Sequence, residues 1–166
     1  MKRLAPTLAL LLALSGCGLR PLYGGGASGI VATTLSRVDV APIEGENGWL
    51  VANALRDRLA PGTPTTAAYR LEIVLDDQIL GLGIRRDDSI TRERRTLRAR
   101  YRLVDLSNGA VLIDATAGSD AGIDVVGSEY ATIAGERTAL ERLSVILADQ
   151  IVTRVALYAR RTAEQP

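Results

Sequence analysis

The chain has 166 residues, a length that favours a single domain, and its 20 basic side chains nearly balance 19 acidic ones. This balance gives no general attraction to nucleic acid. The single cysteine cannot form an internal disulfide, and the absence of histidine excludes Ser-His and Cys-His catalysis and removes a common transition-metal ligand. We therefore expect no cofactor, no metal site and no enzymatic activity.

The amino-terminal segment has the order of a secretory signal. Met1-Lys2-Arg3 is basic, an apolar run follows, and two small residues precede Cys17. The apolar run covers about 11 positions, whereas a membrane-spanning helix needs about 20. We therefore expect residues 1–16 to be a removable signal peptide.

The four residues Leu14-Ser15-Gly16-Cys17 resemble the lipobox of bacterial lipoproteins. In that class the cysteine thiol receives a diacylglycerol, the signal is cut before the cysteine, and the new amino terminus is acylated. The resemblance implies lipid attachment at Cys17, and several acyl chains, such as palmitate, would hold the protein firmly on a membrane. The alternative is that Cys17 is an ordinary small residue of the signal. Gly18, in place of an aspartate, implies sorting to the outer membrane.

Residues 17–30 are expected to form the lipidated start and a glycine-rich flexible tether. A first strand is expected over residues 35–42. A helix is expected from Gly48 to about Ala60, with Asn47 as its cap. The apolar residues of this helix have helical spacing and are expected to face the core: Trp49, Ala52, Leu55 and Leu59.

Three strands are predicted next. Apolar and polar residues alternate from Tyr69 to Asp76, a further strand covers about 89–106, and Asn108-Gly109 is typical of a hairpin turn into a strand over 110–119. One face of the middle strand is apolar, with Leu97, Ala99, Tyr101 and Leu103. Its other face, with the residues upstream of it, carries Arg92, Arg94, Arg95, Arg98, Arg100 and Arg102.

A long helix is expected from a cap at Ser128 to about Arg160, with Ile133 as the first of its core-facing residues. Residues 162–166 are expected to be a disordered tail. The order strand-helix-strand-strand-strand-helix predicts an α+β two-layer sandwich, in which two helices pack on one face of a small, mostly antiparallel four-stranded sheet. The first strand can run parallel to its neighbour, because a helix follows it. Residues 31–161 should form this single domain.

The run Cys17-Gly18-Leu19-Arg20-Pro21-Leu22-Tyr23-Gly24 resembles the mature start of LptE, the lipopolysaccharide-assembly lipoprotein family, particularly its alphaproteobacterial branch. The predicted layout agrees with that family. The resemblance implies a non-enzymatic protein held by its lipid on the periplasmic face of the outer membrane. It also implies a β-barrel partner like LptD, which the protein helps to assemble and in which it sits as a plug. Together the two proteins would deliver lipopolysaccharide to the outer leaflet of the outer membrane.

With this resemblance, the six arginines become candidates for contact with lipopolysaccharide phosphates or with a polar barrel wall. Two simpler readings stay open: a solvated strand face, and charges that protect an exposed strand edge from aggregation.

Two other functions also stay open. One is an auxiliary periplasmic lipoprotein of a lipid-transport ABC system, which would also combine a lipobox with a small α/β domain. The other is a lipid-anchored hydrolase that uses Asp and Glu, which the missing histidine and the lack of a nucleophile motif disfavour.

Overall fold

A computed structural model describes residues 29–59, 66–84, 90–125 and 127–164. The predictions for the signal, Cys17 and residues 17–28 lie outside these residues. The described parts contain α2 (Ile30–Leu35), β1 (Val38–Val40), α3 (Gly45–Leu59), β2 (Tyr69–Ile84), β3 (Ile90–Asp105), β4 (Val111–Asp124) and α4 (Glu129–Ala163).

The four strands form one sheet in the order β1-β2-β3-β4. β1 pairs with β2 in parallel, whereas the β2–β3 and β3–β4 pairs are antiparallel. In the β3–β4 hairpin the paired residues run from Val104 opposite Val111 to Arg92 opposite Asp124. At the turn between β3 and β4, Gly109 has a φ of 73°, and the Asn108 side chain accepts a hydrogen bond from the Ala110 amide at 2.9 Å. The predicted α+β, mostly antiparallel architecture and this hairpin are confirmed.

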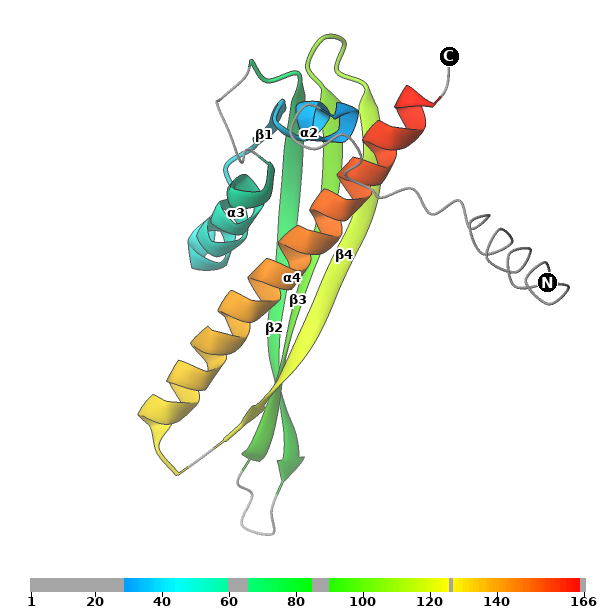
Figure 1. The fold of residues 1–166 in the computed structure, drawn as a ribbon. Coiled ribbons are helices and arrows are strands. Elements are labelled where there is room, and N and C mark those ends of the chain that lie inside the picture. Colours follow the sequence, from blue (N-terminus) through cyan, green and yellow to red (C-terminus); the bar gives the residue numbers. More distant parts are fainter. Residues whose placement is uncertain (1–28, 60–65, 85–89, 126, 165–166) are drawn as a thin grey trace, which may run out of the picture.

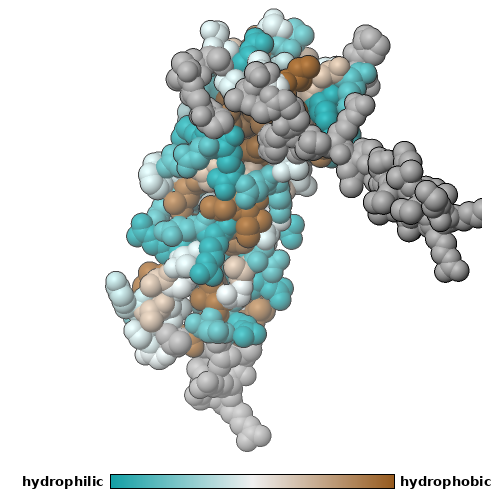
Figure 2. All heavy atoms as spheres, in the orientation of Figure 1, coloured by the Kyte–Doolittle hydropathy of each residue, from teal (hydrophilic) through white to brown (hydrophobic). Residues whose placement is uncertain are grey.

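The core lies between the sheet and the two long helices, which cover the same face of the sheet (Figure 1). It is built from fully buried aliphatic side chains of both layers, among them Leu55, Leu71, Leu97, Leu103, Leu143, Leu147 and Ile151. Seen from the helix side, the remaining exposed apolar residues are interspersed with hydrophilic ones (Figure 2). The apolar alternation of the strands and the helical stripes therefore meet in one core.

The segment before β1 differs from the expectation. Residues 30–35 form the short helix α2, and the strand is reduced to Val38–Val40. The sequence of α2 is rich in β-branched residues, which favour strands, but Val31 and Leu35 are buried and the helix packs against α4. Tertiary packing thus overrides the local preference.

Two residues expected in the core lie at the surface. Trp49 is 63% exposed, because it lies outside the buried stripe of α3. That stripe includes Val51, Leu55 and Leu59. Ile133 is 55% exposed, because the buried residues of α4 begin only at Ala139. Both predictions were wrong, because the spacing of apolar residues fixes neither how a helix is rotated against its neighbours nor how far it overlaps them.

The start of α4 follows the sequence, whereas several other element ends differ from the expectation by a few residues. α4 begins after Ser128, whose side chain accepts a hydrogen bond from the Ala131 amide at 3.5 Å, and it continues to Ala163. β4 continues to Asp124, beyond its expected end at Ser119. α3 begins at Gly45, so Asn47 lies inside the helix and is not its cap.

Candidate functional site

The sheet has one face that no described helix covers, and β3 shows the two faces clearly. Leu97, Ala99, Tyr101 and Leu103 of β3 are buried against the helices. The alternate side chains of the same strand are exposed on the other face, and five of them are arginines: Arg92, Arg94, Arg98, Arg100 and Arg102. The predicted division of β3 into an apolar and a basic face is confirmed for these residues.

Arg95 does not belong with the other five arginines. It follows Arg94 directly, so its side chain points to the helix-covered face, where it is 9% exposed. Its guanidinium binds both carboxylate oxygens of Asp77, at 2.9 and 2.5 Å, and donates to the Glu136 carbonyl at 2.9 Å. Asn47 also donates to Asp77, at 2.6 Å.

This buried cluster joins β2, β3, α3 and α4. The hydrogen bond with Asp77 raises the pKa of Arg95, which outweighs the opposing effect of burial. Arg95 is therefore a fixed structural cation, and we exclude it from the surface site that the sequence suggested.

Three of the outward arginines are held by carboxylates of the neighbouring strands. Arg100 binds Asp114 through two hydrogen bonds, at 3.2 and 3.0 Å, while Arg102 binds Glu72 at 2.8 Å and Arg92 binds Asp124 at 3.1 Å. Hydrogen bonding to Arg100 lowers the pKa of Asp114 and raises that of Arg100, so this pair stays ionised at neutral pH.

Charges of opposite sign alternate over the described part of this face. Register and alternation place six arginines on it: Arg70, Arg92, Arg94, Arg98, Arg100 and Arg102. They place six carboxylates beside them: Asp39, Glu72, Asp76, Asp114, Asp120 and Asp124. The face is therefore polar and close to electrically neutral. The carboxylates were not among the residues predicted from the sequence, although counting back from the Asn108-Gly109 turn brings Asp114 beside Arg102.

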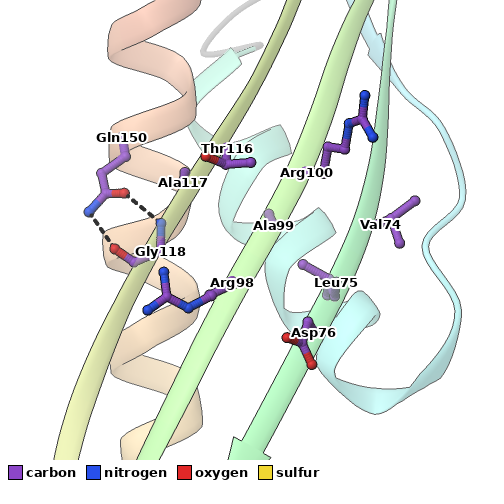
Figure 3. Close-up of a pocket in the computed structure, with 10 residues that line it drawn as sticks. All are labelled: Val74, Leu75, Asp76, Arg98, Ala99, Arg100, Thr116, Ala117, Gly118 and Gln150. Carbon is purple, nitrogen blue, oxygen red and sulfur yellow. Dashed lines mark hydrogen bonds between the residues drawn. The ribbon is translucent and has the colours of Figure 1, made fainter.

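Arg94 and Arg98 are the two β3 arginines on this face with no carboxylate in ion-pair contact among the described residues. Arg98 lies beside a shallow hollow of about 480 Å³, which is also lined by Val74, Asp76, Thr116 and Gly118 (Figure 3). Val74 is 73% exposed. The hollow thus combines an available guanidinium with an apolar side chain.

Gln150 of α4 closes part of the sheet edge beside this hollow. Its side-chain oxygen accepts from the Gly118 amide at 3.1 Å and its nitrogen donates to the Gly118 carbonyl at 3.3 Å (Figure 3). The amide thereby takes the place that a further strand would occupy on β4. Edge protection is thus provided by this helix residue at Gly118, and not by the arginines alone.

The described residues contain no cluster of three or more His, Cys, Asp or Glu side chains arranged to hold a metal ion. None of the described helices is both long and apolar enough to cross a membrane.

One apolar sheet face covered by helices, and one face left open, define a small two-layer α+β domain. The model of the family described as LptE: Lipopolysaccharide-assembly matches residues 35–155. The chain belongs to this family of non-enzymatic lipoproteins.

Solved structures agree with this assignment. A protein described as a lipoprotein from Caulobacter crescentus CB15 superposes with a TM-score of 0.67 and 27% identity, over 81% of this chain and 98% of that one. Rare lipoprotein B from Shewanella oneidensis superposes with a TM-score of 0.59 and 12% identity, over 76% of this chain and 96% of that one. Lipoprotein B from Nitrosomonas europaea has a TM-score of 0.58 and 13% identity, over 76% of this chain and 84% of that one. The last two similarities show the shared fold. None of the curated proteins matches the sequence significantly.

Proposed function

We propose that this protein is anchored to the periplasmic face of the outer membrane by lipid on Cys17. There it partners a large β-barrel of the LptD kind, assists its assembly and occupies it as a plug in lipopolysaccharide delivery. The observation that carries this proposal, beyond family membership, is the open sheet face with its alternating charges. A barrel interior is polar and water-filled, so a charged but nearly neutral face can lie against it without burying a large net charge.

The arginines then divide into two groups. Arg92, Arg100 and Arg102 are already bound to carboxylates and would present polar, charge-compensated surface to the barrel wall. Arg94 and Arg98 are available for lipopolysaccharide phosphates, which a guanidinium can bind through two parallel hydrogen bonds. Val74 beside Arg98 adds apolar surface next to such a phosphate site.

Co-purification tests the proposed partner. The full-length tagged protein, extracted from outer membranes in mild detergent, should recover a large β-barrel in roughly equal amount. Depletion of the protein should leave that barrel misassembled and reduce lipopolysaccharide at the cell surface. Recovery of an inner-membrane permease complex instead would favour the ABC-system alternative, and a normal barrel in depleted cells would refute the proposal.

The double variant Arg94→Glu/Arg98→Glu tests the phosphate contacts. We expect it to bind lipopolysaccharide at least about tenfold more weakly, because the loss of even one hydrogen bond to a charged group costs about 1.5–3 kcal/mol. The loss should be larger at low salt than at high salt, since these charges are exposed to screening. Equilibrium binding of labelled lipopolysaccharide at two salt concentrations measures it.

The double variant Arg56→Glu/Arg142→Glu is the matched control, because it changes the net charge by the same amount at two exposed arginines of α3 and α4, outside the open sheet face. It should bind lipopolysaccharide as the wild type does. Equal losses of affinity in this control and in Arg94→Glu/Arg98→Glu would mean that net charge alone causes the loss.

A further inference from the structure

A second basic cleft lies between β4 and the carboxy-terminal turns of α4. It has a volume of about 260 Å³ and is lined mainly by Leu112, Asp114, Arg154, Leu157, Tyr158 and Arg161. It shares no lining residue with the hollow beside Arg98. The function proposed above therefore leaves this cleft without a role.

Helical spacing places the polar groups of the cleft on one side of α4. Arg154, Tyr158 and Arg161 are separated by four and three residues, so they form one row along two turns. Neither arginine has an ion-pair partner among the described residues. Asp114, the carboxylate at the rim, is already bound to Arg100. Two guanidinium groups are therefore available in one cleft.

The helix dipole explains only one of these arginines. Arg161 lies in the last turn of α4, where a cation is favoured by the helix carbonyls. Arg154 lies more than two turns before the end at Ala163, beyond the range of that effect. Its charge instead acts on Tyr101, where it opposes the rise in the pKa of the phenol that burial causes. Arg154, which is exposed, thus places a cation in the cleft with no ion-pair partner among the described residues.

The chemistry of the cleft fits a phosphate that carries an apolar chain. Two arginines and a phenol can donate hydrogen bonds to phosphate oxygens. Leu112 and Leu157, both half-buried, supply apolar surface beside them. A phospholipid headgroup combines these two features, and basic pockets are known to bind such headgroups between the helices of membrane proteins.

The position of the cleft is consistent with a membrane ligand. α2, the β3–β4 turn and the carboxy-terminal turns of α4 lie at the same end of the molecule (Figure 1). Twelve residues separate Gly29, at this end, from Cys17, and an extended chain of that length spans at most roughly 40 Å. If Cys17 is lipidated, as proposed above, this end stays within reach of the leaflet.

We propose that Arg154, Tyr158 and Arg161 bind the phosphate of an anionic phospholipid headgroup in the leaflet to which the protein is anchored. The bound headgroup would fix the orientation of the domain relative to the membrane, which a flexible lipid tether cannot do.

Arginine-selective labelling of the native lipidated protein in vesicles tests this proposal. Phenylglyoxal should modify Arg154 and Arg161 about tenfold more slowly in vesicles that contain phosphatidylglycerol than in pure phosphatidylcholine vesicles. Arg142, exposed on the same helix, should react equally in both. Peptide mass spectrometry gives the rate at each residue. Equal rates for Arg154 and Arg161 in the two kinds of vesicle would overturn the proposal.

Two further arms identify the source of the phosphate. Phosphatidylcholine vesicles with added inorganic phosphate, or with lipopolysaccharide, should not give the protection that phosphatidylglycerol gives. Full protection by inorganic phosphate, or protection by lipopolysaccharide alone, would overturn the assignment to a phospholipid. In the Arg154→Gln variant, Arg161 should lose its protection by phosphatidylglycerol. Failure of the lipid anchor itself is distinguishable, because the protein would then not float with pure phosphatidylcholine vesicles, which lack the anionic headgroup.

Discussion

Replacing Arg95 with alanine should lower the free energy of unfolding by about 3–5 kcal/mol, because the change leaves an uncompensated buried charge. Asp77 has a side chain only 9% exposed, and it would lose the two hydrogen bonds from the guanidinium. The Glu136 carbonyl would lose its donor as well. Urea denaturation followed by circular dichroism measures the loss, which should appear as a lower transition midpoint with an unchanged slope.

Two comparisons show whether burial causes this loss. Arg100→Ala breaks an ion pair of similar geometry on the open face and should leave the midpoint unchanged, since that pair is solvated. The double variant Arg95→Met/Asp77→Leu removes both charges and should recover much of the stability, because apolar groups of similar volume can replace a buried pair. If Arg95→Ala shifted the midpoint no more than Arg100→Ala does, the pair would not be buried in solution.

The Arg95 cluster helps to hold the charged face in place, on which the proposed function depends. β2 and β3 are joined by their own ladder, but only side chains tie this region of the sheet to the helices. Arg95 and Asp77 connect both strands to α3 through Asn47 and to α4 through Glu136. The face opposite this cluster carries Arg94 and Arg98, so the cluster keeps the two available guanidinium groups on a rigid surface.

Alternation of side chains predicted much of the site. In β3 the period of two separates Leu97, Ala99, Tyr101 and Leu103 from the arginines between them, and the structure has the same division. The same rule places Arg95 on the apolar face. The prediction instead placed it with the neighbouring arginines because of its charge. Burial of an arginine needs a partner, and Asp77 lies on another strand, 18 residues away.

The features that sequence could not provide depend on distances between elements. The neutrality of the open face follows from the register of three strands, which brings Glu72 beside Arg102 and Asp124 beside Arg92. The exposure of Trp49 depends on how α3 is rotated against its neighbours. The cleft with Arg154 and Arg161 forms only because α4 runs beside the β4 edge. Local periodicity carries none of this information.

Leu147→Ala should produce the second large effect, a loss of about 2–5 kcal/mol in the free energy of unfolding. Leu147 is fully buried near the middle of α4, in the core between the helices and the sheet. Its truncation removes buried apolar contact and leaves a cavity that the closely packed neighbours cannot fill. Val145→Ala, at a position 43% exposed on the same helix, should change stability by only about 0.5 kcal/mol. Thermal and urea unfolding of both variants measure the difference. A small loss for Leu147→Ala would mean that α4 is not firmly packed on the sheet in the isolated protein.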